Sequence, residues 1–247
     1  MTATVTDLWR HPIKSVGREA LGHVTLTAGQ TLPGDRLWAV AHDASTVAQG
    51  EWARCLNFIR VASSPRLAAV EVTTEGDALH LRHPDQPDLT IQPDRDETRL
   101  IAWLAPLVAE GRSAPDRLVR APAERGMTDT SAPSITLASH ASHRAVEEAA
   151  GTEMSVHRWR CNIWLDGLAP WEEFGWVDQH IRLGEAEAHV FKRIDRCLAT
   201  TANPATGLRD VPVLDVLDTF GHRDFSVGLT ITKGGRVARG DRVERMS

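Results

Sequence analysis

Residues 226–243 read SVGLTITKGGRVARGDRV. Apolar residues alternate with small or polar ones over 226–232 and again over 237–243, which is the period of a half-buried strand. The four residues between them, KGGR, contain the two glycines that a tight turn uses. This stretch predicts a β-hairpin at the end of the chain and, with it, a mainly β fold.

The same alternation recurs earlier in the chain. It predicts strands at residues 4–8, 21–27, 37–42, 66–73, 78–82 and 89–91, and later at 162–166, 181–183 and 186–194. The strands at 66–73 and 78–82 form a hairpin around Glu75-Gly76-Asp77. A helical period favours helices at 97–110, 139–150 and 213–220 and a helical turn at 171–176. Ser139 is the expected N-cap and Gly151 the expected stop of the second helix.

These elements predict a mostly β (α+β) protein of two strand-rich lobes with a few helices. A Pro-rich, charged stretch at 113–124 separates the two groups of strands. We therefore divide the chain into an N-terminal β-barrel-like domain at residues 1–116 and a second β-barrel domain at residues 117–247. The length of 247 residues is sufficient for two small domains.

The composition excludes several classes of protein. With 42% hydrophobic and 25% charged residues the chain is not disordered, and a net charge of -5 gives no support to nucleic-acid binding. The sequence has neither a long apolar run nor a signal peptide, so we expect no membrane span and a cytoplasmic protein. Three cysteines without CxxC spacing argue against a disulfide framework, a zinc ribbon and an iron–sulfur cluster.

The segment Arg196-Cys197-Leu198-Ala199-Thr200-Thr201 stands where a long predicted strand ends and a polar loop begins. A cation beside a cysteine favours the thiolate and lowers the pKa of the thiol. The hydroxyls of Thr200 and Thr201 can donate to a phosphate or sulfur ligand. The alternative is that Cys197 is a small buried residue at a strand end.

Three more segments carry cations. Lys14-Ser15 follows the first strand, and Arg36 follows the turn Gly34-Asp35. Lys14 and Arg36, with the Ser15 hydroxyl, suit the clamping of an anion, unless they are solvated loop charges with Asp35 paired to Arg36. Arg158-Trp159-Arg160-Cys161-Asn162 adds two cations and an amide, unless Arg158 and Arg160 only keep one strand face solvated.

The order of these segments resembles that of MOSC-domain proteins. The chain is similar to the subgroup that joins an N-terminal MOSC-associated β-barrel domain to the MOSC β-barrel domain, to which the mitochondrial amidoxime-reducing components and their bacterial relatives belong. The resemblance spans nearly the whole chain, and the Arg196-Cys197 pair and the closing strands at 226–243 are its most specific parts. The chain departs from the family pattern at Cys161, where proline is frequent, and at His11, where an aromatic residue is frequent.

The resemblance implies a molybdenum cofactor, a pterin dithiolene (Mo-molybdopterin) that takes one further thiolate from the protein. It implies that Cys197 is the metal ligand and the catalytic residue. It also implies that Lys14, Ser15 and Arg36 hold the pterin and its phosphate. The remaining cofactor-binding candidates are Arg160, Asn162, Arg196 and Thr200. Soft sulfur suits such a metal, and cations suit a phosphate.

The implied activity is reduction of small N-hydroxylated (N–O) substrates, with electrons from a separate reductase that carries either flavin and iron–sulfur groups or haem. No nucleic-acid or membrane partner is expected. One alternative is a non-redox cofactor carrier or sulfur-transfer module with a persulfide on Cys197 or Cys161. Another is a β-rich domain that has lost its cofactor. Asp195 and Asp210 are candidates for proton delivery, although neighbouring arginines make ion pairing the commoner fate of such carboxylates.

Three residues near these segments are interpreted as structural. Cys161 is expected to be structural, with a sulfur relay as the alternative. His11 is expected to pack or to hydrogen-bond rather than to bind metal. Cys55 is expected in the core.

Overall fold

The computed structural model describes residues 3–122 and 124–246, and its architecture is mostly β, as the sequence predicts. The strands are β1 (Ala3–Arg10), β2 (Glu19–Leu21), β3 (His23–Leu26), β4 (Trp38–His42), β5 (Glu71–Glu75), β6 (Ala78–His83), β7 (Gln86–Ile91), β8 (Pro115–Arg120), β9 (Ile135–Ser139), β10 (Ile163–Asp166), β11 (His180–Leu183), β12 (Ala186–Asp195), β13 (Asp224–Lys233), β14 (Gly235–Ala238) and β15 (Arg242–Arg245). The α-helices are α1 (Glu97–Leu104), α2 (His140–Ala150) and α3 (Val213–Asp218). Short 3-10 turns are η1 (Cys55–Asn57), η2 (Pro65–Ala69), η3 (Ala105–Leu107), η4 (Val156–Trp159), η5 (Glu172–Trp176) and η6 (Leu198–Thr201).

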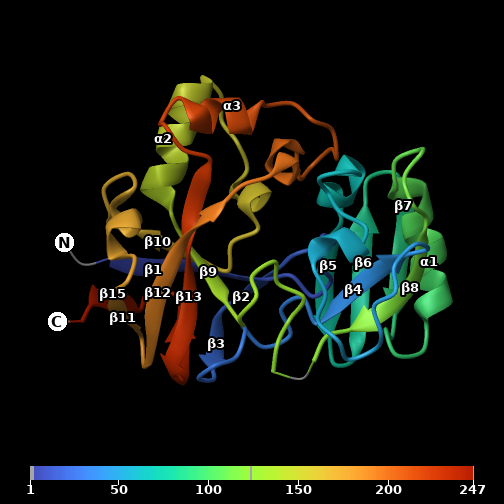
Figure 1. Cartoon of the computed structure of the whole chain (residues 1–247), viewed down its shortest axis with the longest axis horizontal. Helices are drawn as coiled ribbons and strands as arrows, with labels where there is room; N and C mark the ends of the chain where they lie inside the picture. Colours follow the sequence, from blue (N-terminus) through green and yellow to red (C-terminus); the bar gives the residue numbers. More distant parts are fainter. Residues whose placement is uncertain (1–2, 123, 247) are drawn as a thin grey trace.

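Seven strands close into a barrel, which is the left-hand lobe in Figure 1. Their order is β10-β9-β13-β12-β11-β15-β1, and the pairing of β1 with β10 completes the ring. Alternating residues of these strands point inward, so that Leu137, Val190 and Leu229 are fully buried in one apolar cluster. The barrel therefore supplies a rigid scaffold for the loops at its ends.

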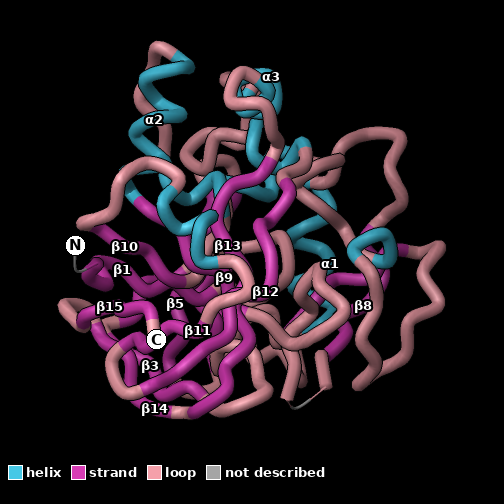
Figure 2. Tube along the Cα trace, turned by 60° about the vertical axis from the view of Figure 1, so that its left-hand side comes forward, coloured by secondary structure: helices cyan, strands magenta, loops and turns pink. Residues whose placement is uncertain are grey.

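The second lobe lies to the right in Figure 1 and contains two small sheets and α1. One sheet pairs β4 with β8, and the other has the order β5-β6-β7. Leu100, Trp103 and Leu104 place the apolar face of α1 against this lobe's core. The helices α2 and α3 belong instead to the barrel lobe, where Figure 2 shows them together at one end of the strands.

The first strands of the chain belong to the barrel rather than to the second lobe. β1 pairs with β10, β15 and β2, while β3 pairs with β14 near the other end of the sequence. The division after residue 116 stays a prediction, and residue 116 lies inside β8. The two lobes are thus tied together by a segment that starts in the barrel and crosses to the second lobe after β3.

The predicted hairpin over 226–243 is wrong in its pairing. β13 pairs with β12 and β9, and β14 leaves the barrel to pair with β3. The reason lies in the two glycines. A Cβ on Gly234 would lie 2.7 Å from the Leu26 carbonyl oxygen, and one on Gly235 would lie 2.5 Å from the Glu185 backbone. These glycines allow close packing of main chains instead of forming a hairpin turn.

Other predicted elements differ mainly at their ends. The helix expected at 97–110 ends at Leu104, because Pro106 cannot continue it and the chain tightens into η3. The strand expected from residue 66 starts at Glu71, since Pro65 opens η2. The strand at 21–27 is split into β2 and β3, and β8 and β9 were not predicted. The Ser139 cap is confirmed, with its hydroxyl accepting from the Ala141 N–H, and Gly151 ends α2 at φ 66°.

No helix within residues 3–122 and 124–246 has the length and apolar character needed to cross a membrane.

Candidate functional site

A cavity of about 370 Å³ lies between the two lobes, and residues of both line it. The barrel lobe contributes the end of β12 and the turn η6, and the second lobe contributes residues 55 and 60–62. All eight residues that the sequence analysis selected line this cavity: Lys14, Ser15, Arg36, Arg160, Asn162, Arg196, Cys197 and Thr200. The fold therefore brings together four segments that are far apart in the sequence.

Three of these lining residues have left-handed backbone conformations. Ser15 has φ 64°, and Arg36 and Arg160 each have φ 51°. For a residue with a side chain this conformation costs about 1–2 kcal/mol. Strain of this kind concentrates at functional sites, where the surrounding structure enforces it. The backbone geometry thus marks the same cavity as the side-chain chemistry.

Lys14 reaches the cavity from the turn that follows β1, although its side chain is almost fully buried. Its Nζ donates to the Met127 carbonyl oxygen at 2.8 Å and to Asp129 Oδ1 at 2.5 Å. Burial lowers the pKa of Lys14, and Asp129 opposes that shift. Asp129 itself is 71% exposed, so the lysine is held between a fixed carbonyl and a carboxylate at the surface.

Arg36 is fixed by a buried acidic partner rather than solvated. Its Nη1 forms an ion pair with Asp35, and its Nη2 donates to the Arg160 carbonyl oxygen at 3.0 Å. Asp35 also accepts from the His11 backbone N–H at 2.7 Å and lies 3.2 Å from His11 Nδ1. Burial lowers the pKa of His11 to about 3, so the imidazole is neutral. The pairing of Asp35 with Arg36, which belonged to the alternative interpretation, is present, but the two side chains are not solvated loop charges; the hydrogen-bonding role expected of His11 is confirmed.

The interpretation of Arg158 and Arg160 as a solvated strand face is wrong, because both guanidinium groups are in the cavity wall. Arg158 Nη2 donates to both oxygens of Asp210, at 2.6 and 2.7 Å, while its buried Nε has no partner among the described residues. Arg160 Nη1 donates to the Gly17 carbonyl oxygen at 3.1 Å. Burial and Arg36 lower the pKa of Arg160 to about 9, which leaves it charged at neutral pH.

The two acidic candidates have different environments. Asp210 is paired with Arg158, the fate expected for a carboxylate beside arginine. Asp195 lines the cavity, is 84% exposed, and lies 3.9 Å from Lys192. Of the two, Asp195 is the one whose carboxylate is open to the cavity mouth.

Cys197 lies at the N-terminus of η6 with its side chain exposed at the cavity, so its interpretation as a buried strand-end residue is wrong. The guanidinium of Arg196 points elsewhere. It donates to the Phe225 carbonyl oxygen at 2.7 Å, to Ser226 Oγ at 2.7 Å and to Cys161 Sγ at 3.2 Å. Successive residues at a strand end face opposite ways, which separates Arg196 from its neighbour's thiol. The guanidinium of Arg196 therefore stabilises the wall of the cavity and does not contact the Cys197 thiol.

Asn162 and Thr200 also direct their polar atoms into the wall. Asn162 Nδ2 donates to the Trp9 carbonyl oxygen at 3.1 Å, and its Oδ1 accepts from Thr136 Oγ1 at 3.0 Å. Thr200 Oγ1 donates to the Cys197 carbonyl oxygen at 3.0 Å, and Thr201 Oγ1 donates to that of Leu198 at 2.8 Å. Both hydroxyls thus donate within η6 in this structure, and their donation to a ligand stays a prediction.

The sequence analysis missed several lining residues. Cys55, expected in the core, is half-buried and lines the cavity from the second lobe, whereas Cys161 is buried behind the wall. Arg60, Arg158 and Lys192 add to the selected cations and bring the lining to seven: Lys14, Arg36, Arg60, Arg158, Arg160, Lys192 and Arg196. Among the described residues two lining carboxylates, Asp129 and Asp195, oppose them. A chain with a net charge of -5 thus has a strongly cationic cavity.

The loop after η6 connects the cavity wall to the second lobe. Ala202 is fully buried in that lobe's apolar cluster, and Arg209 Nη2 donates to the Ala62 carbonyl oxygen at 2.7 Å. In Figure 1 this orange segment approaches the teal segment that contains η2. Gly207, at φ 69°, packs so closely that an added Cβ would lie 2.6 Å from Arg66 Cα.

Gly207→Ala is expected to destabilise the contact between the lobes. The left-handed conformation and the collision with the Arg66 backbone together cost about 2 kcal/mol, or about 5 °C in Tm for a chain of this size. Thermal unfolding followed by circular dichroism measures the change. Gly221→Ala is the matched control, since Gly221 has φ 80° but open space around it. Equal losses in the two variants would show that the Arg66 contact contributes nothing.

The fold and the cavity define a two-lobe β protein with a cation-rich candidate site between a closed barrel and a smaller lobe. The chain belongs to the MOSC-domain family. The MOSC N-terminal beta barrel domain matches residues 2–121, and the MOSC domain matches residues 127–244.

The comparison with solved structures finds similar chains at low identity. The YuaD protein from Bacillus subtilis is 14% identical with a TM-score of 0.49, over 98% of this chain and 94% of that one. YiiM from Geobacillus stearothermophilus is 15% identical with a TM-score of 0.36, over 46% of this chain and 54% of that one. No curated protein matches the chain.

Proposed function

We propose that the chain binds a molybdenum–pterin cofactor in the cavity and reduces small N-hydroxylated compounds, in the cytoplasm, with electrons from a separate reductase. One observation carries the proposal. Eight residues chosen from four separate segments line one cavity, and among the described residues its lining as a whole has seven cations against two carboxylates. Such a lining suits a phosphate-bearing ligand.

The residues in the wall fit such a group. Arg158 Nε is a buried donor with no partner in the part of the chain that the structure describes, so an anionic ligand at this wall would satisfy it. Even when Asp35 and Asp210, which pair with Arg36 and Arg158, are added to the two lining carboxylates, the cations remain in excess. The exposed Cys197 thiol is the soft donor that a heavy, thiophilic metal prefers. Charge, hydrogen bonding and ligand type therefore agree.

Each of the selected lining residues would have its own role in binding the cofactor. Lys14 and Arg36, with Arg160 behind them, would neutralise the phosphate, and Ser15 would add a hydroxyl. Cys197 would ligate the metal, while Asn162, Arg196 and Thr200 would hold the wall and η6 in place through the bonds described above. When bound, the cofactor supplies a redox-active metal able to accept the oxygen of an N–O bond. Asp195, open to the cavity mouth, could hold a proton near the leaving oxygen.

The test is elemental analysis for molybdenum on protein made in a host that synthesises the cofactor, followed by benzamidoxime reduction with reduced methyl viologen. Near-stoichiometric metal and turnover support the proposal. Absence of both in the wild type would overturn it. The exposure of Cys197 also permits a carrier that holds a persulfide, and metal without turnover would favour that function.

Lys14→Gln is expected to weaken retention of the cofactor by about ten- to a hundredfold, because one charge-assisted bond is lost. The fold should persist, since the partner Asp129 is exposed and can be solvated. Asp129→Asn is the opposite change, as it frees Lys14 from its carboxylate, and we expect it to retain the cofactor at least as well as the wild type. Molybdenum remaining after extended dialysis measures both variants. Equal retention in Lys14→Gln and the wild type would contradict the role of Lys14.

A further inference from the structure

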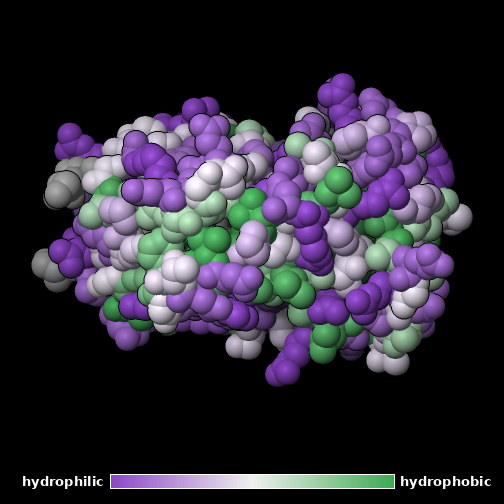
Figure 3. All heavy atoms as spheres, turned by 90° about the horizontal axis from the view of Figure 1, so that it is seen from above, coloured by the Kyte–Doolittle hydropathy of each residue, from purple (hydrophilic) through white to green (hydrophobic). Residues whose placement is uncertain are grey.

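The described residues expose three large hydrophobic side chains, and all three lie in segments that line the cavity or contact its lining. Leu56, Leu198 and Leu208 are 65%, 53% and 63% exposed. Leu56 follows the lining residue Cys55, and Leu198 stands between the lining residues Cys197 and Ala199. Figure 3 shows hydrophobic residues gathered toward the middle of one face, between the two lobes. We call Leu56, Leu198 and Leu208 the mouth leucines.

Leu208 is tied to the mouth by its neighbour. Arg209 Nη1 donates to the Leu198 carbonyl oxygen at 2.7 Å, and its Nη2 donates to that of Ala62, a lining residue of the second lobe. The mouth leucines therefore come from both lobes and from the loop that joins them. An exposed apolar patch with a polar border is a mark of an interaction surface.

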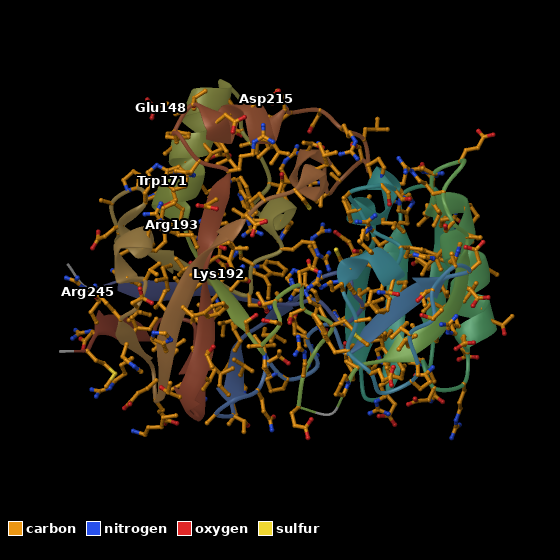
Figure 4. The ribbon with its side chains drawn as sticks, in the orientation of Figure 1. Glu148, Trp171, Lys192, Arg193, Asp215 and Arg245 are labelled. Atoms are coloured by element: carbon orange, nitrogen blue, oxygen red, sulfur yellow. The ribbon has the colours of Figure 1, made fainter. Side chains whose placement is uncertain are left out.

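The charges around the mouth leucines are mainly positive. Arg54 and Arg209 are exposed and Arg60 is half-buried, and none of the three joins an ion pair among the described residues. Lys192, which Figure 4 places on β12 near the middle of the molecule, has only a loose contact with Asp195 at 3.9 Å. The guanidinium group of arginine binds both oxygens of a carboxylate, so the positive charges around the mouth leucines fit an acidic protein.

The leucines also indicate a protein rather than a lipid surface. They lie on separate turns and a loop, and not on one amphipathic helix of the kind that inserts into a membrane interface. Apolar anchors on rigid turns with arginines at the edge are typical of a protein interface. The two lobes hold these anchors around an opening that leads to Cys197.

We propose that the mouth leucines and Arg54, Arg60, Lys192 and Arg209 form the docking surface for an acidic electron-transfer protein. The proposal rests on the reductase function proposed above. Each turnover breaks one N–O bond, forms one N–H bond and one water, and takes up two protons from solvent. The two electrons come from the partner, in two successive dockings where it is a one-electron carrier such as ferredoxin, and each donor molecule is left oxidised. Docking at the mouth places that partner beside the site that needs the electrons.

The experiment compares two electron donors on the molybdenum-loaded full chain. Reduced plant-type ferredoxin is an acidic protein donor, and reduced methyl viologen is a small donor that needs no docking surface. Leu56→Ser/Leu208→Ser is expected to lower the ferredoxin-driven rate about tenfold and leave the viologen-driven rate unchanged. Arg54→Glu should act in the same direction and flatten the decrease of the rate with salt. Arg245→Glu, at the far edge of the barrel in Figure 4, is the matched charge control.

The outcomes separate the two proposals. Turnover with viologen but none with ferredoxin, or equal ferredoxin-driven rates in the wild type and the leucine variant, would overturn the docking surface and leave the reductase function standing. Failure with both donors would overturn the reductase function. If the wild type binds vesicles of phosphatidylserine and phosphatidylcholine and the leucine variant does not, the mouth leucines contact a membrane. If the wild type is a dimer in solution and the leucine variant is not, they contact a second copy of the chain. Either result would overturn the docking proposal.

Discussion

Replacing Cys197 by alanine is expected to lower benzamidoxime reduction with reduced methyl viologen by at least about a hundredfold. Changes to groups that only support a metal ligand already cost about ten- to a hundredfold in affinity or activity, so loss of the ligand itself should cost more. Cys197 is exposed at the end of η6, so the change leaves no cavity in the core. The rate, the molybdenum content and the metal's absorption spectrum are the measurements.

Cys55→Ala is the matched control for that variant. It removes the same thiol from the opposite wall of the same cavity. We expect it to keep its molybdenum, its spectrum and most of its activity. An active Cys197→Ala enzyme with an unchanged spectrum would exclude Cys197 as the ligand. Loss of metal in Cys55→Ala alone would move the ligand to the second lobe.

Glu173→Gln is expected to make the protein about 3 kcal/mol more stable than the wild type at pH 8. Glu173 is fully buried in η5, and its carboxyl accepts from Ser142 Oγ at 2.7 Å. Burial raises its pKa from 4.5 to about 7. The folded state therefore holds a proton that the unfolded chain releases between these two values. This contribution to stability is complete below pH 4.5, declines as the pH rises, and is lost above about pH 7.

Urea unfolding of wild type and variant from pH 4.5 to 8 measures the effect. The difference between their free energies of unfolding should grow with pH up to about 7 and then level off, and the groups common to both proteins cancel in this difference. Glu172→Gln, the adjacent change on the same turn, should keep most of the pH dependence, because the Glu172 charge is the smallest of the causes that act on the Glu173 pKa and burial is the largest. A constant difference across the range would show that Glu173 is ionised throughout.

The sequence contained the local parts of this fold but not its long-range pairing. Ser139 and Gly151 mark the two ends of α2 through contacts within a few residues, so the identities of these two residues suffice to predict where the helix begins and ends. Gly234 and Gly235 resembled a hairpin turn because the sequence cannot show that their partners are Leu26 and Glu185. β1 likewise gives no sign that its neighbours are β10 and β15.

The candidate site shows the same division. The resemblance selected Cys197, Lys14 and Arg36, and the structure brings all three to one cavity. The partners of these residues lie far off in sequence: Lys14 contacts Asp129, which is 115 residues further along the chain. Cys55 has no local signal, since a cysteine beside apolar residues resembles a core position. For Arg196 the sequence predicted a contact that the structure lacks. Arg196 is adjacent to Cys197 in the chain, but its guanidinium donates to Cys161 Sγ instead of lying beside the Cys197 thiol.

The closure of the barrel sets an order of events during synthesis. β1 can pair with β2 soon after both are made, but its pairings with β10 and β15 wait until those much later strands have been translated. Pairings of such long sequence separation form slowly. The turn that carries Lys14 and Ser15 follows β1 directly, so this wall of the cavity is translated well before the barrel that positions it can close. While the chain is being made, the cavity would therefore be open to solvent. A large ligand could be enclosed between the lobes only at the last stage of folding, when the barrel closes.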